Sequence, residues 1–254
     1  MYGHGAPSPP RLRVYETVGE AFRLTFRNFR TMLGLALAPI VLAVLLPAVM
    51  RLDLQTDASS VQLVIHAIAR LFLLSVFAVA WHRYLLLGTR DTSVPIQFWP
   101  SARDVKYFGR LILFLLPQEI ILVAMQAHDL LLVLVLLLIT LFVAAPFALA
   151  FPATAVDNYQ GLMAARRALR GATLQLVGAI LLSFVAITVF LFLLGGVLGS
   201  LVLATFGPGA MVSFFNALTF LTVGIPVAVV TVAYRKLTPQ APAFGTAATP
   251  ANDS

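Results

Sequence analysis

The chain contains no cysteine among its 254 residues. This absence excludes disulfide bonds, thiolate metal sites and cysteine nucleophiles. Charged side chains are also scarce: they make up 11% of the residues, against about a quarter in a soluble domain. So few charges cannot cover a water-facing surface, and the sequence therefore predicts that lipid surrounds most of the protein.

Apolar residues account for 60% of the chain, and the mean hydropathy is +0.95. A hydrocarbon core about 30 Å thick needs roughly 20 apolar residues per helical span, so the sequence predicts an all-α membrane protein with six transmembrane helices. The predicted spans lie at about 31–50, 62–82, 111–127, 130–151, 173–205 and 211–234. The fifth is long enough to tilt strongly or to bend at Gly195 and Gly196.

The polar ends of the chain are expected to lie outside the membrane domain. We expect a flexible N-terminal tail at 1–12, a six-span domain at 13–236 and a disordered tail at 237–254. The N-terminal sequence MYGHGAPSPPRLR has no apolar h-region, so a cleavable signal peptide is not expected.

Lys and Arg residues are concentrated in alternate loops between the predicted spans. On this reading, one side of the membrane holds 15 of the 17 basic residues, and the opposite loops hold only Arg51. Because cytoplasmic loops collect Lys and Arg, the pattern predicts an inner (plasma) membrane protein with both termini in the cytoplasm. The net charge of +7 follows from the same bias, so nucleic acid is not an expected partner.

The clusters of basic residues on the predicted cytoplasmic side have the pattern of short amphipathic helices. In VYETVGEAFRLTFRNFR, Phe22, Phe26 and Phe29 recur at helical spacing, with a charged stripe on another face. Such a helix can lie in the headgroup region with its apolar side in the acyl chains. We therefore expect membrane lipids as partners, with anionic headgroups contacting Arg23, Arg27, Arg30, Arg103, Lys106, Arg110, Arg166, Arg167 and Arg170.

The sequence also fits three parallel repeats, each an interfacial helix followed by a transmembrane hairpin. A shift of 140 residues superimposes Arg27 on Arg167 and Arg30 on Arg170. Capping-box patterns open the three units at Thr17 with Glu20, Ser101 with Asp104, and Asp157 with Gln160. The alternative is that any helix entering a membrane from the cytoplasm is basic and amphipathic, without true repetition.

The arrangement resembles a broad group of bacterial multi-span proteins, which includes the membrane domain attached to some glycerophosphodiester phosphodiesterases. The resemblance lies in VYETVGEAFRLTFRNFRTMLGLAL and in AVDNYQGLMAARRALRGATLQLVGAILL, about a third of the chain. It implies a multi-span fold and a membrane location. No phosphodiesterase domain follows in these residues, so the resemblance does not imply that activity.

Two ionisable residues, Arg70 and Glu119, lie inside predicted spans, where each charge costs a few kcal/mol. Arg70 is 13 residues before Arg83, or about 20 Å along a helix. His66 lies one turn before Arg70, and Gln118 adjoins Glu119. These four residues form a candidate intramembrane polar site for a substrate or proton; the alternative is an ion pair that only fixes helix packing.

Other features predict packing or membrane anchoring. Gly195 and Gly199 form a GxxxG pattern, which lets two helices approach closely within the chain, in a homo-oligomer or against a partner membrane protein. His82 and Arg83 lie between Trp81 and Tyr84, as in an interfacial aromatic belt.

No catalytic or metal motif of the HExxH, GxSxG or Walker type occurs in the sequence, so no catalytic residue, metal or cofactor is expected. The sequence leaves three functions open. The first is a non-enzymatic membrane-organising or partner-binding protein. The second is a small transporter or permease component that uses the intramembrane polar site, and the third is a membrane-embedded lipid enzyme.

Overall fold

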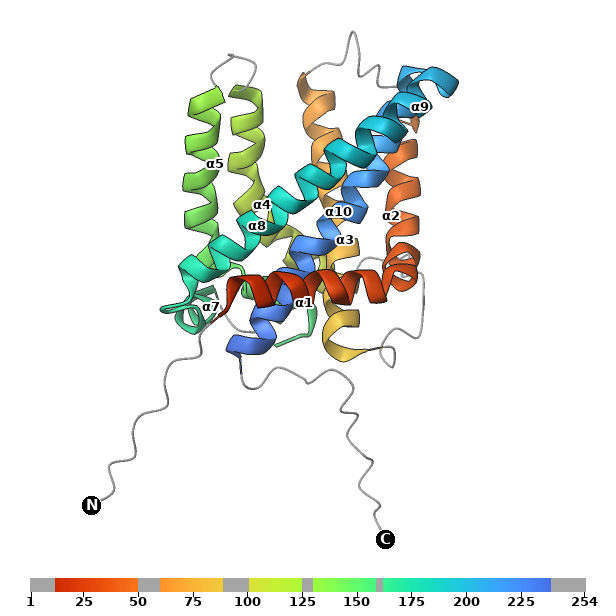
Figure 1. Cartoon of the computed structure of the whole chain (residues 1–254). Coiled ribbons are helices and arrows are strands. Elements are labelled where there is room, and N and C mark those ends of the chain that lie inside the picture. The colour runs from red at the N-terminus through yellow and green to blue at the C-terminus, as the bar shows by residue number, and fades with distance from the viewer. Residues whose placement is uncertain (1–11, 50–59, 89–100, 125–129, 159–161, 239–254) are drawn as a thin grey trace, which may run out of the picture.

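The computed structural model of the chain describes residues 12–49, 60–88, 101–124, 130–158 and 162–238. Within these ranges every regular element is a helix. Figure 1 shows the long helices gathered into one bundle, with one helix crossing its lower end. The all-helical prediction is therefore confirmed for the described residues.

Four helical stretches are long and apolar enough to cross a membrane. They are Phe29–Leu46 in α2 (Phe29–Val49), Val64–Leu87 in α3 (Ser60–Leu87), Thr173–Leu193, which begins with α8 (Thr173–Phe190), and Gly209–Leu237 in α10 (Pro208–Leu237). These four candidate membrane-spanning helices overlap the first, second, fifth and sixth predicted spans.

The predicted third and fourth spans correspond to α4 (Ala102–Ala124) and α5 (Leu130–Ala144). These two helices lie side by side in Figure 1. The predicted fourth run, 130–151, is not one helix, because a 3-10 turn over Ala145–Phe147 follows α5 and leads into the short helix α6 (Ala150–Ala155). Pro146 lies in that turn and lacks the N–H that a continuing helix needs.

The fifth predicted span is a single long helical segment that crosses the bundle obliquely (Figure 1). It consists of α8, a π-helical turn over Leu191–Gly195 and α9 (Gly196–Phe206). The π-helical turn ends at Gly195, where the sequence predicted a tilt or a bend. Gly207 then ends α9 with a φ of +84°, and Pro208 begins α10.

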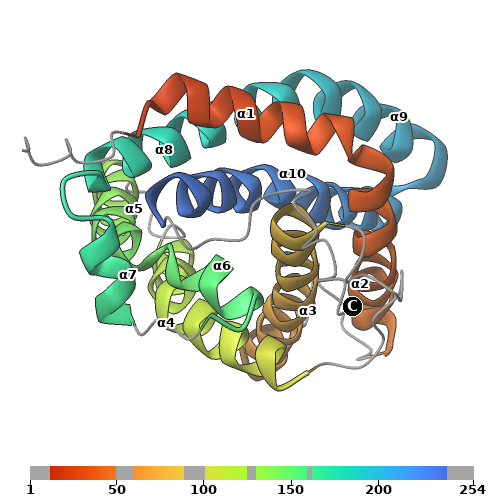
Figure 2. The ribbon, with the colours of Figure 1, turned by 90° about the horizontal axis from the view of Figure 1, so that it is seen from below.

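Two helices lie outside the upright bundle. The first, α1 (Val14–Arg27), runs crosswise and passes α8 and α10 near the lower end of the bundle, as the view from below in Figure 2 shows. The second, α7 (Leu162–Ala168), lies at the same end. The turn between α1 and α2 is fixed by Asn28, whose Nδ2–H donates to the Leu24 carbonyl and whose Oδ1 accepts from the Tyr84 hydroxyl, at 2.8 Å in both cases.

The best-packed core lies in the halves of α3 and α10 nearest to α1. Its largest fully buried side chains include Trp81, Phe220 and Tyr234. Trp81 Nε1–H donates to the carbonyl oxygen of Gly224 at 2.9 Å. A Cβ on Gly224 would lie 2.5 Å from Met32 Sδ, so the glycine permits the close approach of α10 to α2. This core fixes the relative positions of the helices that carry the basic residues.

Candidate functional site

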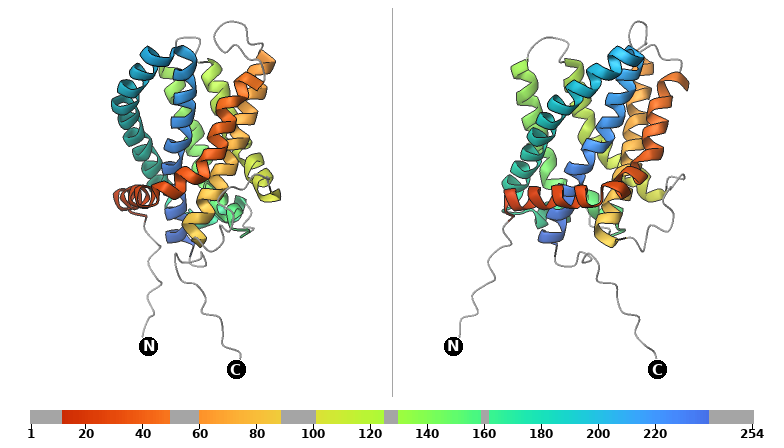
Figure 3. Two further views of the ribbon diagram at one scale, coloured as in Figure 1. Left: turned by 90° about the vertical axis from the view of Figure 1, so that its right-hand side faces the viewer. Right: turned by 45° about the vertical axis from the view of Figure 1, so that its right-hand side comes forward.

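The lower end of the bundle in Figure 1 gathers the ends of α3 and α10, the starts of α2 and α4, and the whole of α1 and α7. Together with Arg13 just before α1 and Arg170 just after α7, these elements carry every Lys and Arg of the described residues except Arg70. We call this end the basic end. The two views in Figure 3 show the same elements together from other sides. Some of its cations are exposed, and others bind groups inside the fold.

Helix α1 packs one face against the bundle and exposes another. Thr17, Val18, Ala21 and Thr25 are buried, and their positions i, i+1, i+4 and i+8 lie on one face of a helix. Glu20 pairs with Arg235 and Lys236 at the end of α10, and the Lys236 Nζ lies 2.9 Å from a Glu20 oxygen. Ion pairs and apolar packing therefore hold α1 against α10.

The arginines that directly follow Phe22 and Phe26 in α1 and Phe29 at the start of α2 are not part of this packed face. Arg23, Arg27 and Arg30 are exposed. Helix α7 and the turn after it add three more exposed residues, which are Arg166, Arg167 and Arg170. These six side chains, which we call the outward arginines, form an exposed cationic surface at the basic end, contributed by α1, the start of α2, α7 and the turn after α7.

Arg103 and Arg110, two of the predicted headgroup contacts, are instead turned inward by the fold. Arg103 Nε donates to Asp157 Oδ1 at 2.9 Å, and its Nη2 lies 2.8 Å from Oδ2. Arg110 Nη1 donates to the Ala150 carbonyl at 2.7 Å and also to the Thr154 hydroxyl. Both arginines therefore hold α6 in place and are not part of the exposed cationic surface.

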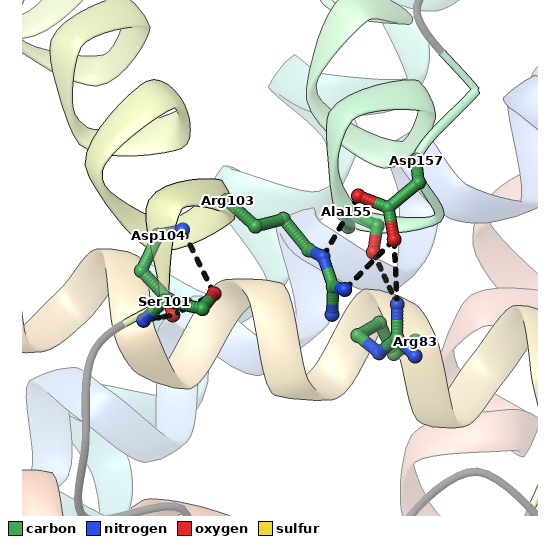
Figure 4. A network of polar contacts seen from close by, with 6 residues as sticks. All are labelled: Arg83, Ser101, Arg103, Asp104, Ala155 and Asp157. Carbon is green, nitrogen blue, oxygen red and sulfur yellow. Dashed lines mark hydrogen bonds and ion pairs between the residues drawn. The ribbon is translucent and has the colours of Figure 1, made fainter.

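Arg83 completes this arrangement at the end of α6, as Figure 4 shows. Its Nη1 donates to the Ala155 carbonyl at 3.0 Å and lies 3.6 Å from Asp157 Oδ2. Cations near a helix C-terminus are favourable because the last carbonyls carry partial negative charge. Arg83, Arg103 and Asp157 therefore form a partly buried cluster that anchors α6 to α3 and α4.

The capping predictions have mixed outcomes. Ser101 and Asp104 form a capping box at the start of α4, because the Ser101 N–H and hydroxyl both donate to Asp104 Oδ2 at 2.6 Å (Figure 4). The predicted box of Thr17 with Glu20 is wrong. Helix α1 begins earlier, at Val14, so Thr17 is buried inside it and Glu20 binds α10 instead.

Asp157 does not cap the start of a helix either. It follows the end of α6 with a left-handed φ of +57°, and α7 begins only at Leu162. Its predicted partner Gln160 lies outside the described residues. The Asp157 carboxylate instead joins the cluster with Arg83 and Arg103.

The predicted aromatic belt at the end of α3 is also wrong, because Trp81, His82 and Tyr84 are buried in the core. His82 Nδ1 lies 2.6 Å from Thr231 Oγ1, and its Nε2 lies 3.2 Å from the Tyr107 hydroxyl. The Thr231 hydroxyl already donates to the Val227 carbonyl, so it accepts from Nδ1–H. Nε2 is then free to accept from Tyr107.

Tyr107 is suited to the role of donor in this group. Burial raises the pKa of its phenol above the ordinary value, because the ionised form would lose its hydration. The hydroxyl therefore stays protonated. Hydropathy did not reveal this buried group of His82, Tyr107 and Thr231, since its members lie on three different helices.

The intramembrane candidates are only partly described. His66 and Arg70 lie on α3, and both are half-buried. The side chains of Gln118 and Glu119 lie outside the described residues, although the backbone at both positions belongs to α4. Helices α3 and α4 contact each other, and the rings of Phe72 in the middle of α3 and Phe108 near the start of α4 are 5.3 Å apart.

The residues that the structure describes contain no group of three or more His, Asp or Glu side chains that could hold a metal ion. No family model, curated protein or solved structure matches this chain.

The GxxxG glycines pack inside the chain. A Cβ on Gly199 would lie 3.2 Å from the ring of Phe215, and one on Gly195 would lie 3.5 Å from both Phe215 and Leu218. Small residues on α9 and the π-helical turn therefore allow α10 to approach closely. This packing sets the angle at which the long α8–α9 segment leaves α10.

Proposed function

We propose that this chain is a non-enzymatic protein of the inner (plasma) membrane with six spans and cytoplasmic termini, and that its basic end binds anionic phospholipid headgroups. By this binding the protein organises the lipid around it. The apolar stretches of α2, α3, α8 and α10 support a membrane location. Helices α4 and α5, which stand together beside α3, supply the remaining two spans in this proposal (Figure 1).

The observation that carries the lipid proposal is the division of the arginines. Arg83, Arg103 and Arg110 bind Asp157 and α6, whereas the six outward arginines are exposed. Each Lys or Arg near an anionic leaflet contributes about 1 kcal/mol of attraction. Exposed arginines on a crosswise helix with an aromatic stripe fit the headgroup layer, where cations meet phosphates and apolar side chains meet acyl chains.

The test is the lipid that remains bound to the purified full-length protein. The wild type is reconstituted in nanodiscs of phosphatidylcholine and phosphatidylglycerol, extracted with mild detergent, and its retained lipids are counted by native mass spectrometry. We expect enrichment of phosphatidylglycerol in the wild type. The enrichment should disappear when Arg27, Arg30, Arg166 and Arg167 are all changed to Glu.

The matched control changes the same four arginines to Lys. This variant keeps the charge and should keep most of the enrichment, which separates the loss of charge from a general effect of substitution. Equal enrichment of phosphatidylglycerol in the wild type and in a folded Glu variant would contradict the proposal.

A second candidate function is transport through the polar position in the middle of α3. His66 and Arg70 are four residues apart and share one face of the helix. His66 Nε2 is buried without a hydrogen-bond partner among the described residues. An unsatisfied polar atom in a membrane helix raises the free energy of the folded protein, and polar residues at such positions often belong to functional sites. This function would place Glu119 opposite His66 and Arg70.

The transport function predicts that Glu119→Gln and Arg70→Gln each abolish a proton flux into proteoliposomes. The flux is followed with an entrapped pH-sensitive dye, while circular dichroism checks that the variants remain helical. If the wild type carries a flux and both variants keep its full rate, the polar position serves only to pack α3.

A further inference from the structure

A cavity of about 200 Å³ lies between α1, α2, α8 and α10. Phe22 and Phe26 line it from α1, and Phe190 and Leu221 line it from α8 and α10. Figure 1 shows the crosswise α1 passing the lower parts of α8 and α10. An apolar cavity of about 150 Å³ stays free of water and binds a molecule as large as benzene, so this cavity can hold part of a hydrocarbon chain.

The cavity opens toward the surface of the bundle. Phe26 is 58% exposed and Phe190 is 44% exposed, although both line the cavity. In the proposed orientation that surface faces the bilayer at the level of α1. A hydrocarbon chain can therefore enter sideways from the membrane, without crossing water.

The Thr25 hydroxyl in the cavity has no hydrogen-bond partner among the described residues. Thr25 is 2% exposed and lines the cavity. The other hydroxyl in the lining, that of Thr222, donates to the Thr219 carbonyl at 3.0 Å. Because an unmade hydrogen bond of a buried hydroxyl is costly, Thr25 points to a ligand with a polar acceptor near the start of its hydrocarbon chain.

Three arginines are next in sequence to phenylalanines that line the cavity. Each of the three phenylalanines that α1 and the start of α2 contribute to the cavity is followed directly by an arginine, as Phe22–Arg23, Phe26–Arg27 and Phe29–Arg30. Neighbouring residues on a helix point about 100° apart, so Arg23 and Arg27 lie on the face of α1 next to Phe22 and Phe26, and Arg30 lies next to Phe29 at the start of α2. Arginine suits phosphate because its planar guanidinium can bind two oxygens at once.

We infer that this cavity is a specific site for one anionic phospholipid. One acyl chain occupies the cavity, the Thr25 hydroxyl donates to its ester carbonyl, and the phosphate binds among Arg23, Arg27 and Arg30. This inference rests on the proposed function, and it adds a single bound lipid to the general attraction of the outward arginines. Helix α1 would thereby contact both the headgroup and the acyl chain of one lipid molecule.

The test measures the binding of phosphatidylglycerol to the full-length protein in mild detergent, again by native mass spectrometry. The wild type should retain one tightly bound phosphatidylglycerol per chain and should prefer it to phosphatidylcholine. Leu221→Trp fills the cavity and should weaken this binding at least tenfold. The matched control is Leu193→Trp, because Leu193 is 64% exposed and is not part of the lining; its binding should not change.

Thr25→Val provides a variant that preserves the shape of the cavity. It removes only the hydroxyl, and loss of one hydrogen bond of ordinary strength should weaken binding roughly fivefold. A phospholipid brominated on its acyl chain gives an independent readout. It should quench the fluorescence of a tryptophan introduced as Phe190→Trp inside the cavity, but not that of Phe192→Trp, which lies outside the lining.

The outcomes separate this site from the general proposal. Replacing Arg23, Arg27 and Arg30 by Gln should remove the preference for phosphatidylglycerol over phosphatidylcholine. If those variants lose the preference while Leu221→Trp and Thr25→Val bind like the wild type, the cavity site is wrong and the headgroup proposal stands. If Leu221→Trp loses the lipid but the Gln variant keeps its preference, the phosphate assignment is wrong.

Discussion

Asp157 lies at the centre of the cluster that anchors α6, and Asp157→Asn isolates its charge. Asn has nearly the same shape and tolerates the left-handed φ of +57° seen here. The substitution therefore leaves the backbone in place and removes the carboxylate from Arg83 and Arg103. The two arginines would then face each other without the anion that lies between them.

The expected cost follows from the exposure of the three side chains. They are 41% exposed for Asp157, 25% for Arg103 and 13% for Arg83. Breaking a fully buried ion pair costs about 3–5 kcal/mol, and an exposed pair contributes about 0.2–1 kcal/mol. For this partly exposed cluster we expect Asp157→Asn to reduce the free energy of unfolding by about 1–2 kcal/mol.

The assay is reversible unfolding in mixed micelles as the mole fraction of dodecyl sulfate increases, followed by circular dichroism. A double-mutant cycle with Arg103→Gln should give a coupling of about 1 kcal/mol, because the two side chains share two close contacts. Asp157→Gly should be about 1 kcal/mol more stable than Asp157→Ala, because glycine has no Cβ to strain the left-handed conformation. Zero coupling would refute the ion-pair role of Asp157, and equal stability of the Gly and Ala variants would refute its left-handed backbone.

Two further predictions concern packing, and the same unfolding assay measures both. Gly199→Leu should destabilise the protein by about 1–3 kcal/mol, because its Cβ alone would lie 3.2 Å from the Phe215 ring. The control is Gly196→Leu, since a Cβ there meets nothing within 4 Å. Equal destabilisation by the two substitutions would contradict the packing of Gly199 against Phe215. His82→Phe should cost about 1–3 kcal/mol by leaving the buried Tyr107 hydroxyl without its acceptor. Adding Tyr107→Phe should recover part of that loss, and a larger loss in the double variant would count against the hydrogen bond.

Hydropathy predicted the long helices well, for a simple physical reason. A helix that crosses lipid must be apolar over its whole length, so its position can be found without any knowledge of its neighbours. The long helices α2, α3 and α10 accordingly overlap the predicted runs. The break after α5 was missed because Ala145–Phe147 carries no polar or charged side chain, and only Pro146 indicated a change.

The roles of individual arginines could not be predicted in the same way. Arg103 and Arg27 both lie in basic amphipathic segments, yet one binds Asp157 and the other is exposed. The difference depends on where α6 folds back between the helices, which is a long-range contact that the spacing of residues does not encode. The burial of Trp81 and His82 was missed for the same reason, because it depends on Gly224 and Thr231 in α10.

The most direct test of the account is the side of the membrane on which the basic end lies. Because the chain has no cysteine, single cysteines can be introduced and labelled in intact cells with a membrane-impermeant maleimide. Met163→Cys on α7 at the basic end should react only after the membrane is permeabilised. Phe206→Cys at the opposite end, and His128→Cys in the predicted loop between spans three and four, should react in intact cells. Labelling of Met163→Cys from outside, or protection of both other positions, would contradict a six-span protein with its basic end in the cytoplasm.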